Sequence, residues 1–549
     1  MKRFFAILAL LLASLAISFY PRVESQMKMP GNERPVVLLA GLGNHHHAVK
    51  TSSPQAQRFF DQGLRLVYAF NHEEAVRSFK RAAELDPQMA MAYWGVAYAL
   101  GPNINLDVDP ERERAAYEAV QKARSLSTQA PENERAYIEA LAKRYSIDPK
   151  ADLKRLAVDF KNAMGELVLR YPDDLDAATI YAESAMNLRP WQLWKADGRP
   201  AEGTEEIIAV LESVLRRDPN HMGAIHYYIH AVEASPNPER ALVYAPKLST
   251  LAPAAGHLVH MPSHIYMRTG DYEAAARSNE EGAQADRNFF KLTGRQGMYP
   301  VMYYNHNLHF LAIAYSMEGR FTDAFRASRD LEANVAPAVK EMPMLGGFMT
   351  TSTLMLARFR RWDEIMRLPQ PDAKMPGVTA VWHFARGMAL AAGGRAPEAE
   401  KELKLLEEAR RAVPKEASFG LNSAESVLKV AETVLGAKLA QARRDNRRAI
   451  ELLRKAVEME DAFAYDEPPA WFLPVRESLG GALLTNRDYS EAERVFRADL
   501  LKNPRSGRSL FGLRESLKAQ GKQSAAAMVQ AEFERAWRNA DTQLRVQDL

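Results

Sequence analysis

Histidines gather in one stretch of this sequence. Seven of the 13 histidines lie between residues 226 and 309, namely His226, His230, His257, His260, His264, His306 and His309. Residues four apart share one face of a helix, so His226 pairs with His230 and His260 pairs with His264. Each pair could bind a metal ion, or both pairs could bind the same ion. Neutral imidazole is a ligand for zinc, copper and iron. The pattern therefore predicts a transition-metal site.

Carboxylates accompany these histidines. Glu233 follows the first pair closely, and Glu183 with Asn187 belongs to the segment IYAESAMNL upstream. A mixed set of imidazole and carboxylate suits zinc or non-haem iron. With an open coordination position, such a set activates water for hydrolysis. We place Glu183 among the expected ligands, and Asn187 and Glu233 among the neighbouring candidates.

A second group of histidines lies near the N-terminus. The run Asn44-His45-His46-His47 indicates metal capture, with His46 and His47 as candidates. His72 follows in the segment Phe70-Asn71-His72-Glu73 and is a further candidate. The alternative for His72 is a purely structural role in the first turn of a helix.

Several classes of active site are excluded. The chain has no cysteine, so disulfides, thiolate nucleophiles and Cys-ligated metals are ruled out. The zinc-protease motif HExxH is absent, because Tyr227 follows His226 and Ser263 precedes His264. Neither a GxxxxGK[ST] loop nor a GxSxG motif occurs. The net charge of +3 gives no reason to expect a nucleic-acid partner.

The N-terminus has the pattern of an export signal. Lys2 and Arg3 precede an apolar run from Phe4 to Leu12, and the small residues of Ser14-Leu15-Ala16 follow. We expect residues 1–20 to be a signal peptide or, if retained, an N-terminal membrane anchor. Residues 21–53 are expected to form an extended lead-in, and the mature chain to be periplasmic or secreted.

The elements that position the histidines follow from an internal repeat. Gly63, Ala75, Phe79, Ala82 and Pro87 fall at offsets of 0, 12, 16, 19 and 24. The same spacing recurs near the C-terminus, and several equivalent positions, such as 241 and 275, are separated by 34 residues. This pattern resembles the tetratricopeptide (TPR) family, whose repeats are helix pairs of that length. We expect residues 54–549 to form an all-α superhelix of at least eight repeats.

The resemblance also implies where the histidines lie. In TPR proteins, positions 2, 5, 9, 12 and 13 of the first helix of each repeat face a concave groove. His226 and His230 fit positions 5 and 9, and the next repeat places His257, His260 and His264 at positions 2, 5 and 9. His306 and His309 fit positions 2 and 5 of the repeat after that. The register thus predicts that three consecutive first helices turn their imidazoles toward one groove.

Two functions remain open. The TPR resemblance extends to uncharacterised bacterial exported TPR proteins through segments such as EPPAWFLPVRESLG around Glu467. It implies a scaffold. Its His-lined groove would bind a peptide, a protein or a small molecule, with zinc, copper or iron as cofactor. The alternative is a metal-dependent hydrolase or oxidoreductase with the histidines as ligands. A metal-free groove in which the histidines bind an anionic or peptide ligand, or histidines that only pack, are the remaining interpretations.

Overall fold

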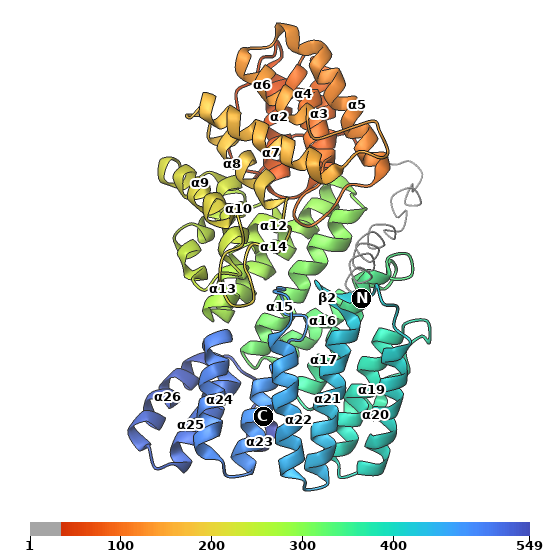
Figure 1. Cartoon of the computed structure of the whole chain (residues 1–549), viewed down its shortest axis with the longest axis vertical. Coiled ribbons are helices and arrows are strands. Elements are labelled where there is room, and N and C mark those ends of the chain that lie inside the picture. Colours follow the sequence, from red (N-terminus) through yellow and green to blue (C-terminus); the bar gives the residue numbers. More distant parts are fainter. Residues whose placement is uncertain (1–33) are drawn as a thin grey trace, which may run out of the picture.

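The computed structural model describes residues 34–549 and has the expected all-α architecture (Figure 1). The expected signal segment, residues 1–20, lies outside the described residues. The N-terminal helices are α2 (Pro54–Tyr68), α3 (His72–Leu85), α4 (Ala90–Leu100), α5 (Pro110–Leu126), α6 (Glu132–Ala142), α7 (Leu153–Arg170), α8 (Leu175–Met186), α9 (Thr204–Arg217) and α10 (Met222–Val232).

The middle of the chain contains shorter and less regular helices. They are α11 (Leu248–Leu251), α12 (Gly256–His260), α13 (Pro262–Thr269), α14 (Tyr272–Thr293), α15 (Asn305–Met317), α16 (Phe321–Val335), α17 (Thr351–Arg358) and α18 (Trp362–Arg367). Short 3₁₀ segments, at Pro238–Val243 and Pro343–Thr350 among others, and a π-helical turn at Pro300–Tyr304 connect them.

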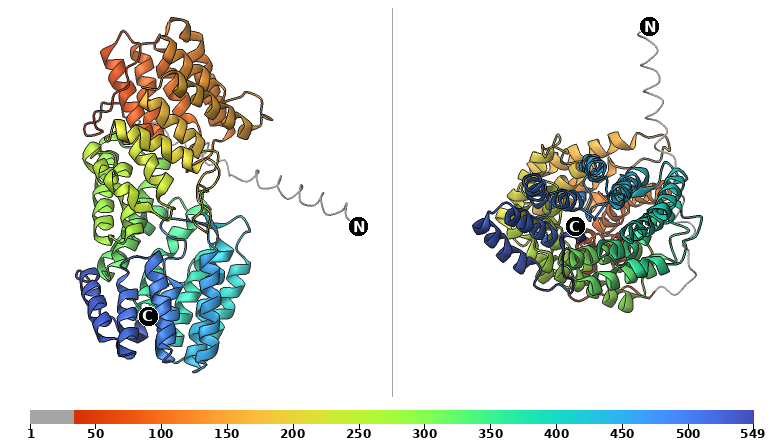
Figure 2. Two further views of the ribbon diagram at one scale, coloured as in Figure 1. Left: turned by 60° about the vertical axis from the view of Figure 1, so that its left-hand side comes forward. Right: turned by 90° about the horizontal axis from the view of Figure 1, so that it is seen from below.

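The C-terminal helices form regular hairpins. They are α19 (Pro376–Ala392), α20 (Ala396–Arg411), α21 (Ala424–Ala442), α22 (Asn446–Asp461), α23 (Val475–Thr485), α24 (Tyr489–Lys502), α25 (Gly507–Ala519) and α26 (Gln523–Ala536). The strands β1 (Ser418–Phe419) and β2 (Asn422–Ser423) pair antiparallel in the turn before α21. Each helix packs against its neighbours in sequence, and the pairs follow a curved path (Figure 2).

The repeat residues explain the close packing of these hairpins. A Cβ atom on Gly63 would lie 2.6 Å from the ring of Phe79, and one on Gly480 would lie 2.3 Å from the ring of Phe496. Each phenylalanine therefore occupies the space that a side chain on the facing helix would need. Ala241 and Ala275, the two positions separated by one period, are both 0% exposed. The structure is thus a superhelix of stacked helix pairs of the TPR type.

Two large apolar clusters divide the chain. One is formed by buried residues between Leu42 and Ile265, and the other by buried residues between Tyr272 and Leu549. The helices that carry the central histidines, α10, α12, α13 and α15, lie where the two clusters meet (Figure 1). No helix among residues 34–549 is long and apolar enough to cross a membrane.

Candidate metal centre

Six of the seven central histidines come together in two groups of three. We call His226, His230 and His257 the first trio, and His260, His264 and His306 the second trio. Within each trio one ligand nitrogen of every ring lies within 4.8 Å of the others. The trios are neighbours, since the ring centroids of His230 and His264 are 5.5 Å apart and those of His257 and His260 are 5.6 Å apart.

The two trios are built in the same way. An i,i+4 pair supplies two rings, from α10 in the first trio and from the consecutive short helices α12 and α13 in the second, and the next repeat supplies the third ring. In the first trio, Nε2 of His226 lies 3.1 Å from Nε2 of His230 and 3.2 Å from Nε2 of His257. In the second trio, Nε2 of His264 lies 2.9 Å from Nε2 of His260 and 3.4 Å from Nε2 of His306. The repeat has therefore duplicated one three-imidazole arrangement.

The hydrogen-bond partners of the outer ring nitrogens assign the tautomers of two rings in the first trio, those of His226 and His230, whereas Nδ1 of His257 has no partner among residues 34–549. Nδ1 of His226 lies 2.7 Å from the carbonyl oxygen of Tyr68, and Nδ1 of His230 lies 2.7 Å from a carboxylate oxygen of Glu233. Both partners accept, so both Nδ1 atoms donate a proton. Burial, and the repulsion that a second protonated ring at His230 would add, lower the pKa of His226 well below its usual value, and burial lowers the pKa of His230 too. Both rings are therefore neutral, and both Nε2 atoms are unprotonated.

Two unprotonated nitrogens thus face each other at 3.1 Å in the first trio. Their lone pairs repel, and a cation between them would convert that repulsion into two ligand bonds. Around a tetrahedral ion with metal–nitrogen bonds of about 2.0–2.1 Å, neighbouring nitrogens lie about 3.3–3.4 Å apart. The four Nε2–Nε2 distances given above lie within about half an ångström of that value, and the third distance of each trio is within 4.8 Å. The residues present therefore fit an ion bound by three imidazoles.

The second pair is oriented in the same way. Nδ1 of His260 lies 2.6 Å from the side-chain oxygen of Asn279, whose amide nitrogen donates to the Ala275 carbonyl and so fixes the orientation of the amide. Nδ1 of His264 lies 2.5 Å from Glu233. Burial opposes the charged form of His264, but Glu233 and Glu467 outweigh it and raise the pKa to about 9. Without a metal, a proton on His264 thus takes the place of the ion between its Nε2 and that of His260.

Glu233 joins the two trios. One of its oxygens accepts from His230 and the other accepts from His264, and the carboxylate is 1% exposed. Burial opposes its ionisation, but the two imidazoles hold the pKa well below the ordinary value. An ionised carboxylate behind a ligand histidine fixes the ring and raises its basicity. Glu233, predicted as a neighbouring candidate, therefore orients one ligand of each trio.

Aromatic rings enclose both trios. Phe70 packs against His226, His230 and His257, with centroid distances of 4.4, 5.8 and 5.4 Å. Phe310 packs against all three rings of the second trio at 4.6 to 4.8 Å. Because of this packing, His226 and His260 are 0% exposed. The sequence predicts that the histidines line a concave groove; in the structure five of the six are buried and His306 is half-buried, so they form an enclosed centre instead of a groove surface.

A segment from the C-terminal half completes the enclosure. The turn between α22 and α23 brings the Tyr465 hydroxyl to 3.4 Å from Glu233, and a Glu467 oxygen to 3.5 Å from Nδ1 of His264. Tyr465 also donates a hydrogen bond to Glu467. Burial raises the pKa of Glu467 above its ordinary value. Sequence spacing could not place these residues, because they are separated from Glu233 by more than 200 positions.

A small cavity reaches one edge of the centre. It measures about 20 Å³ and contacts His230 and Glu233. Its other walls are largely apolar and include Trp191, Trp194 and Met186. A volume of this size holds about one or two water molecules.

Two residues predicted as ligands lie outside the trios. Glu183 in α8 accepts hydrogen bonds from the Tyr98 hydroxyl and from Asn187, and it faces that pair instead of the imidazoles. His309 packs against Phe348 and Phe472. It lies about 4.5 Å further along the helix axis than His306, because each residue of a helix advances about 1.5 Å.

The N-terminal histidines form a different arrangement around Asp176. His45 and His47 lie 2.9 and 2.8 Å from its two oxygens, and Nε2 of His221 lies 3.3 Å away. Nδ1 of His221 accepts the amide proton of Ala224, so its Nε2 carries a proton. Here His45 and His47 donate N–H groups to the Asp176 carboxylate and the N–H of His221 lies nearby, so the carboxylate has hydrogen-bond partners without a metal. Burial opposes the ionisation of Asp176, but these bonds keep its pKa well below the usual value.

The other N-terminal candidates lie apart from this group. His46 is 2.8 Å from Asp61, and its side chain is 55% exposed. His72, the first residue of α3, accepts a hydrogen bond from Asn103 and stacks on Phe70. Burial, together with Arg112 and Arg144, lowers the pKa of His72 to about 3.

Comparison with known proteins adds little to this geometry. No protein-family model matches the chain, and no curated protein matches it. A human IFIT1 dimer with m7Gppp-AAAA is 13% identical over 89% of this chain and 91% of that one, with a TM-score of 0.34. Yeast Tom70 is 13% identical over 87% and 90%, with a TM-score of 0.27. The P58(IPK) TPR domain is 12% identical over 85% and 99%, with a TM-score of 0.23. At this level of likeness, no ligand or activity of these proteins is assigned to this chain.

Proposed function

We propose that this protein binds two transition-metal ions side by side, one in each trio of imidazoles. The observation that carries the proposal is the pair of unprotonated Nε2 atoms of His226 and His230, 3.1 Å apart in a buried site. The repetition of the arrangement in the second trio supports a second ion. Glu233, which holds one ring of each trio, supports a coupled pair of sites.

The ligand chemistry narrows the choice of metal. Each trio offers three imidazole nitrogens, once His264 has released its proton in the second trio, while the nearby carboxylates are used as hydrogen-bond acceptors behind the rings. Imidazole suits copper and zinc, and non-haem iron sites commonly add a carboxylate ligand. Copper and zinc are therefore favoured over iron.

The open coordination positions favour a metal-dependent enzyme over a purely structural site. Structural zinc has four protein ligands, whereas catalytic zinc has three and binds water or substrate at the fourth position. Each trio provides three. When bound, such an ion acts as a Lewis acid or supplies a metal-activated water. The cavity beside His230 and Glu233 is small, which supports water or a molecule of a few atoms as the species that reaches the ions.

Metal titration tests this proposal. The mature chain, stripped with a chelator, is titrated calorimetrically with zinc and, separately, with copper, and we expect two equivalents to bind. Replacing both His226 and His230 by alanine should leave one equivalent, and replacing both His260 and His264 should also leave one. His46→Ala, at an exposed ring, is the control and should leave both. One equivalent in the unaltered chain, or two in either double variant, would overturn the proposal.

A further inference from the structure

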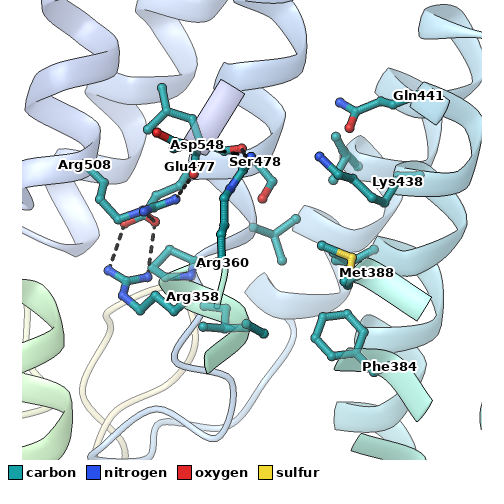
Figure 3. Close-up of a pocket in the computed structure, with 18 of the residues that line it drawn as sticks. Arg358, Arg360, Phe384, Met388, Lys438, Gln441, Glu477, Ser478, Arg508 and Asp548 are labelled. Carbon is teal, nitrogen blue, oxygen red and sulfur yellow. Dashed lines mark hydrogen bonds and ion pairs between the residues drawn. The ribbon is translucent and has the colours of Figure 1, made fainter. Parts of the chain in front are cut away.

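A second candidate site lies in the C-terminal half, away from the histidines. A cavity of about 70 Å³ opens between the first helices of successive repeats, α17, α19, α21, α23 and α25 (Figure 3). Asp548 and Leu549 form part of its wall. A volume of this size holds about five water molecules.

The charges around this cavity do not balance. Four cationic side chains line it, Arg358, Arg360, Lys438 and Arg508, whereas the carboxylates are three, those of Glu477, Asp548 and the terminal residue Leu549. The excess is one positive charge, and Lys438 and Arg360 are half-buried, so an anion beside them would offset part of their desolvation cost.

All three carboxylates are already engaged, and that of Leu549 accepts from Arg360 at 3.0 Å. Glu477 accepts from Arg508 at 2.7 Å and from Arg358 at 3.2 Å. Asp548 lies 3.6 Å from Arg360 and 3.1 Å from Arg545, which approaches it from outside the cavity. Nε of Arg358 is buried and has no hydrogen-bond partner within residues 34–549.

Lys438 is the cation left over. Its ammonium group makes no hydrogen bond or ion pair with any residue of the described part of the chain, and Figure 3 shows it pointing from α21 into the cavity. Burial, with Arg360 beside it, lowers the pKa of Lys438 to about 8. Burial, with Arg508 beside it, lowers the pKa of Arg360 to about 10. An anion between these two groups would relieve both effects.

The wall beside Lys438, across the cavity from Arg358 and Arg508, has apolar side chains. Phe384 and Met388 of α19 lie next to Lys438 in Figure 3, and Val434 and Trp471 also line the cavity. A fully hydrated inorganic anion would leave this wall without a partner. An occupant with a charged end and an apolar body would satisfy both sides.

We propose that this cavity binds a small organic acid, whose carboxylate pairs with Lys438 and Arg360 and whose apolar body packs against Phe384 and Met388. The inference is independent of the metal centre. The ligand has about five to ten non-hydrogen atoms, since the cavity holds about five water molecules. Arg360 has donors in a planar fork that suits a carboxylate.

Calorimetry with benzoate tests the inference, because benzoate combines a carboxylate with an apolar ring. We expect benzoate to bind, and benzamide, its uncharged counterpart, to bind about tenfold or more weakly, the loss of one charge-assisted hydrogen bond. Inorganic phosphate should also bind more weakly than benzoate. Equal binding of benzoate and benzamide, phosphate binding as tight as benzoate, or no benzoate binding would overturn the proposal.

A variant and a labelling experiment locate the site. Lys438→Met should weaken benzoate binding about tenfold or more, whereas Lys404→Met, at an exposed lysine of α20, should not. Amine labelling of the unaltered chain, read by peptide mass spectrometry, avoids any effect of the variant on folding. Benzoate should slow labelling of Lys438 but not of Lys404. Unchanged labelling of Lys438 at saturating benzoate would contradict the assignment.

Discussion

Replacing Glu233 by glutamine gives the most specific consequence of the proposed centre. The carboxylate accepts from Nδ1 of His230 at 2.7 Å and from Nδ1 of His264 at 2.5 Å. An amide of the same shape has one oxygen and one NH₂ group, so it can accept from only one of the two rings. The other ring faces a donor and must move its proton to Nε2, where the metal is expected to bind.

The magnitude follows from the role of such partners. Losing the acceptor behind a ligand histidine lowers metal affinity about 10- to 100-fold, or about 1.4–2.7 kcal/mol. Because the amide still serves one ring, this loss should fall on one ion, while the other retains nearly its original affinity. Glu233→Gln should therefore turn two tight binding events into one tight and one weak event.

Calorimetric titration of the stripped protein with zinc measures both events. Glu239→Gln, at an exposed carboxylate in the 3₁₀ segment after α10, is the matched control and should behave like the unaltered chain. Circular dichroism of both variants establishes that the helices are retained. Two unchanged affinities in Glu233→Gln would refute the tautomer argument, and an equal loss at both sites would refute the division of the carboxylate between the trios.

Three further outcomes concern stability. A metal at 100 times its dissociation constant should stabilise the fold by about 2.7 kcal/mol per site, an effect that a chelator reverses in thermal unfolding. Gly480→Ala should destabilise the fold by about 1–3 kcal/mol in urea unfolding, because the new Cβ would lie 2.3 Å from the ring of Phe496. Gly436→Ala is the control: its Cβ would have its nearest neighbour 3.7 Å away, so this variant should stabilise the fold by about 0.5–1 kcal/mol. Burial and Glu477 raise the pKa of Asp499 to about 6, so the folded state holds this proton more tightly and stability falls as pH rises from about 4 to 6. Urea unfolding at successive pH values measures this loss of stability. It should be smaller by about 2–3 kcal/mol in Asp499→Asn and unchanged in Asp363→Asn, at the surface.

The repeat made the fold predictable from the sequence. Gly63 with Phe79, and Gly480 with Phe496, are local pairs whose spacing reflects the close contact of two helices in one hairpin. A register that repeats along the chain also placed His226, His230, His260 and His264 on equivalent faces of neighbouring first helices. The pairing of each i,i+4 set could therefore be anticipated.

The composition of each trio could not be anticipated to the same extent. His306 lies in the second trio, whereas His309 packs against aromatic rings. The two histidines are almost one helical turn apart, and spacing does not show which of them reaches the other rings. Glu183 accepts hydrogen bonds from Tyr98 and Asn187, because α8 turns its side chain toward α4. Spacing alone does not reveal which hydrogen-bond partner a buried carboxylate will find.

The tautomers and the enclosure of the site needed three-dimensional information. The acceptor behind His226 is the backbone carbonyl of Tyr68, which has no sequence signature. Tyr465 and Glu467 reach the centre from the opposite half of the superhelix. Segments so far apart in sequence meet only because the helix pairs curve back toward one another.

Anomalous X-ray diffraction from crystals of the metal-loaded protein, collected at the absorption edge of zinc or copper, tests the central claim most directly. The account predicts two peaks, one among the Nε2 atoms of His226, His230 and His257 and one among those of His260, His264 and His306. A single peak shared by the six rings, or a peak at Asp176 with none at the trios, would contradict it.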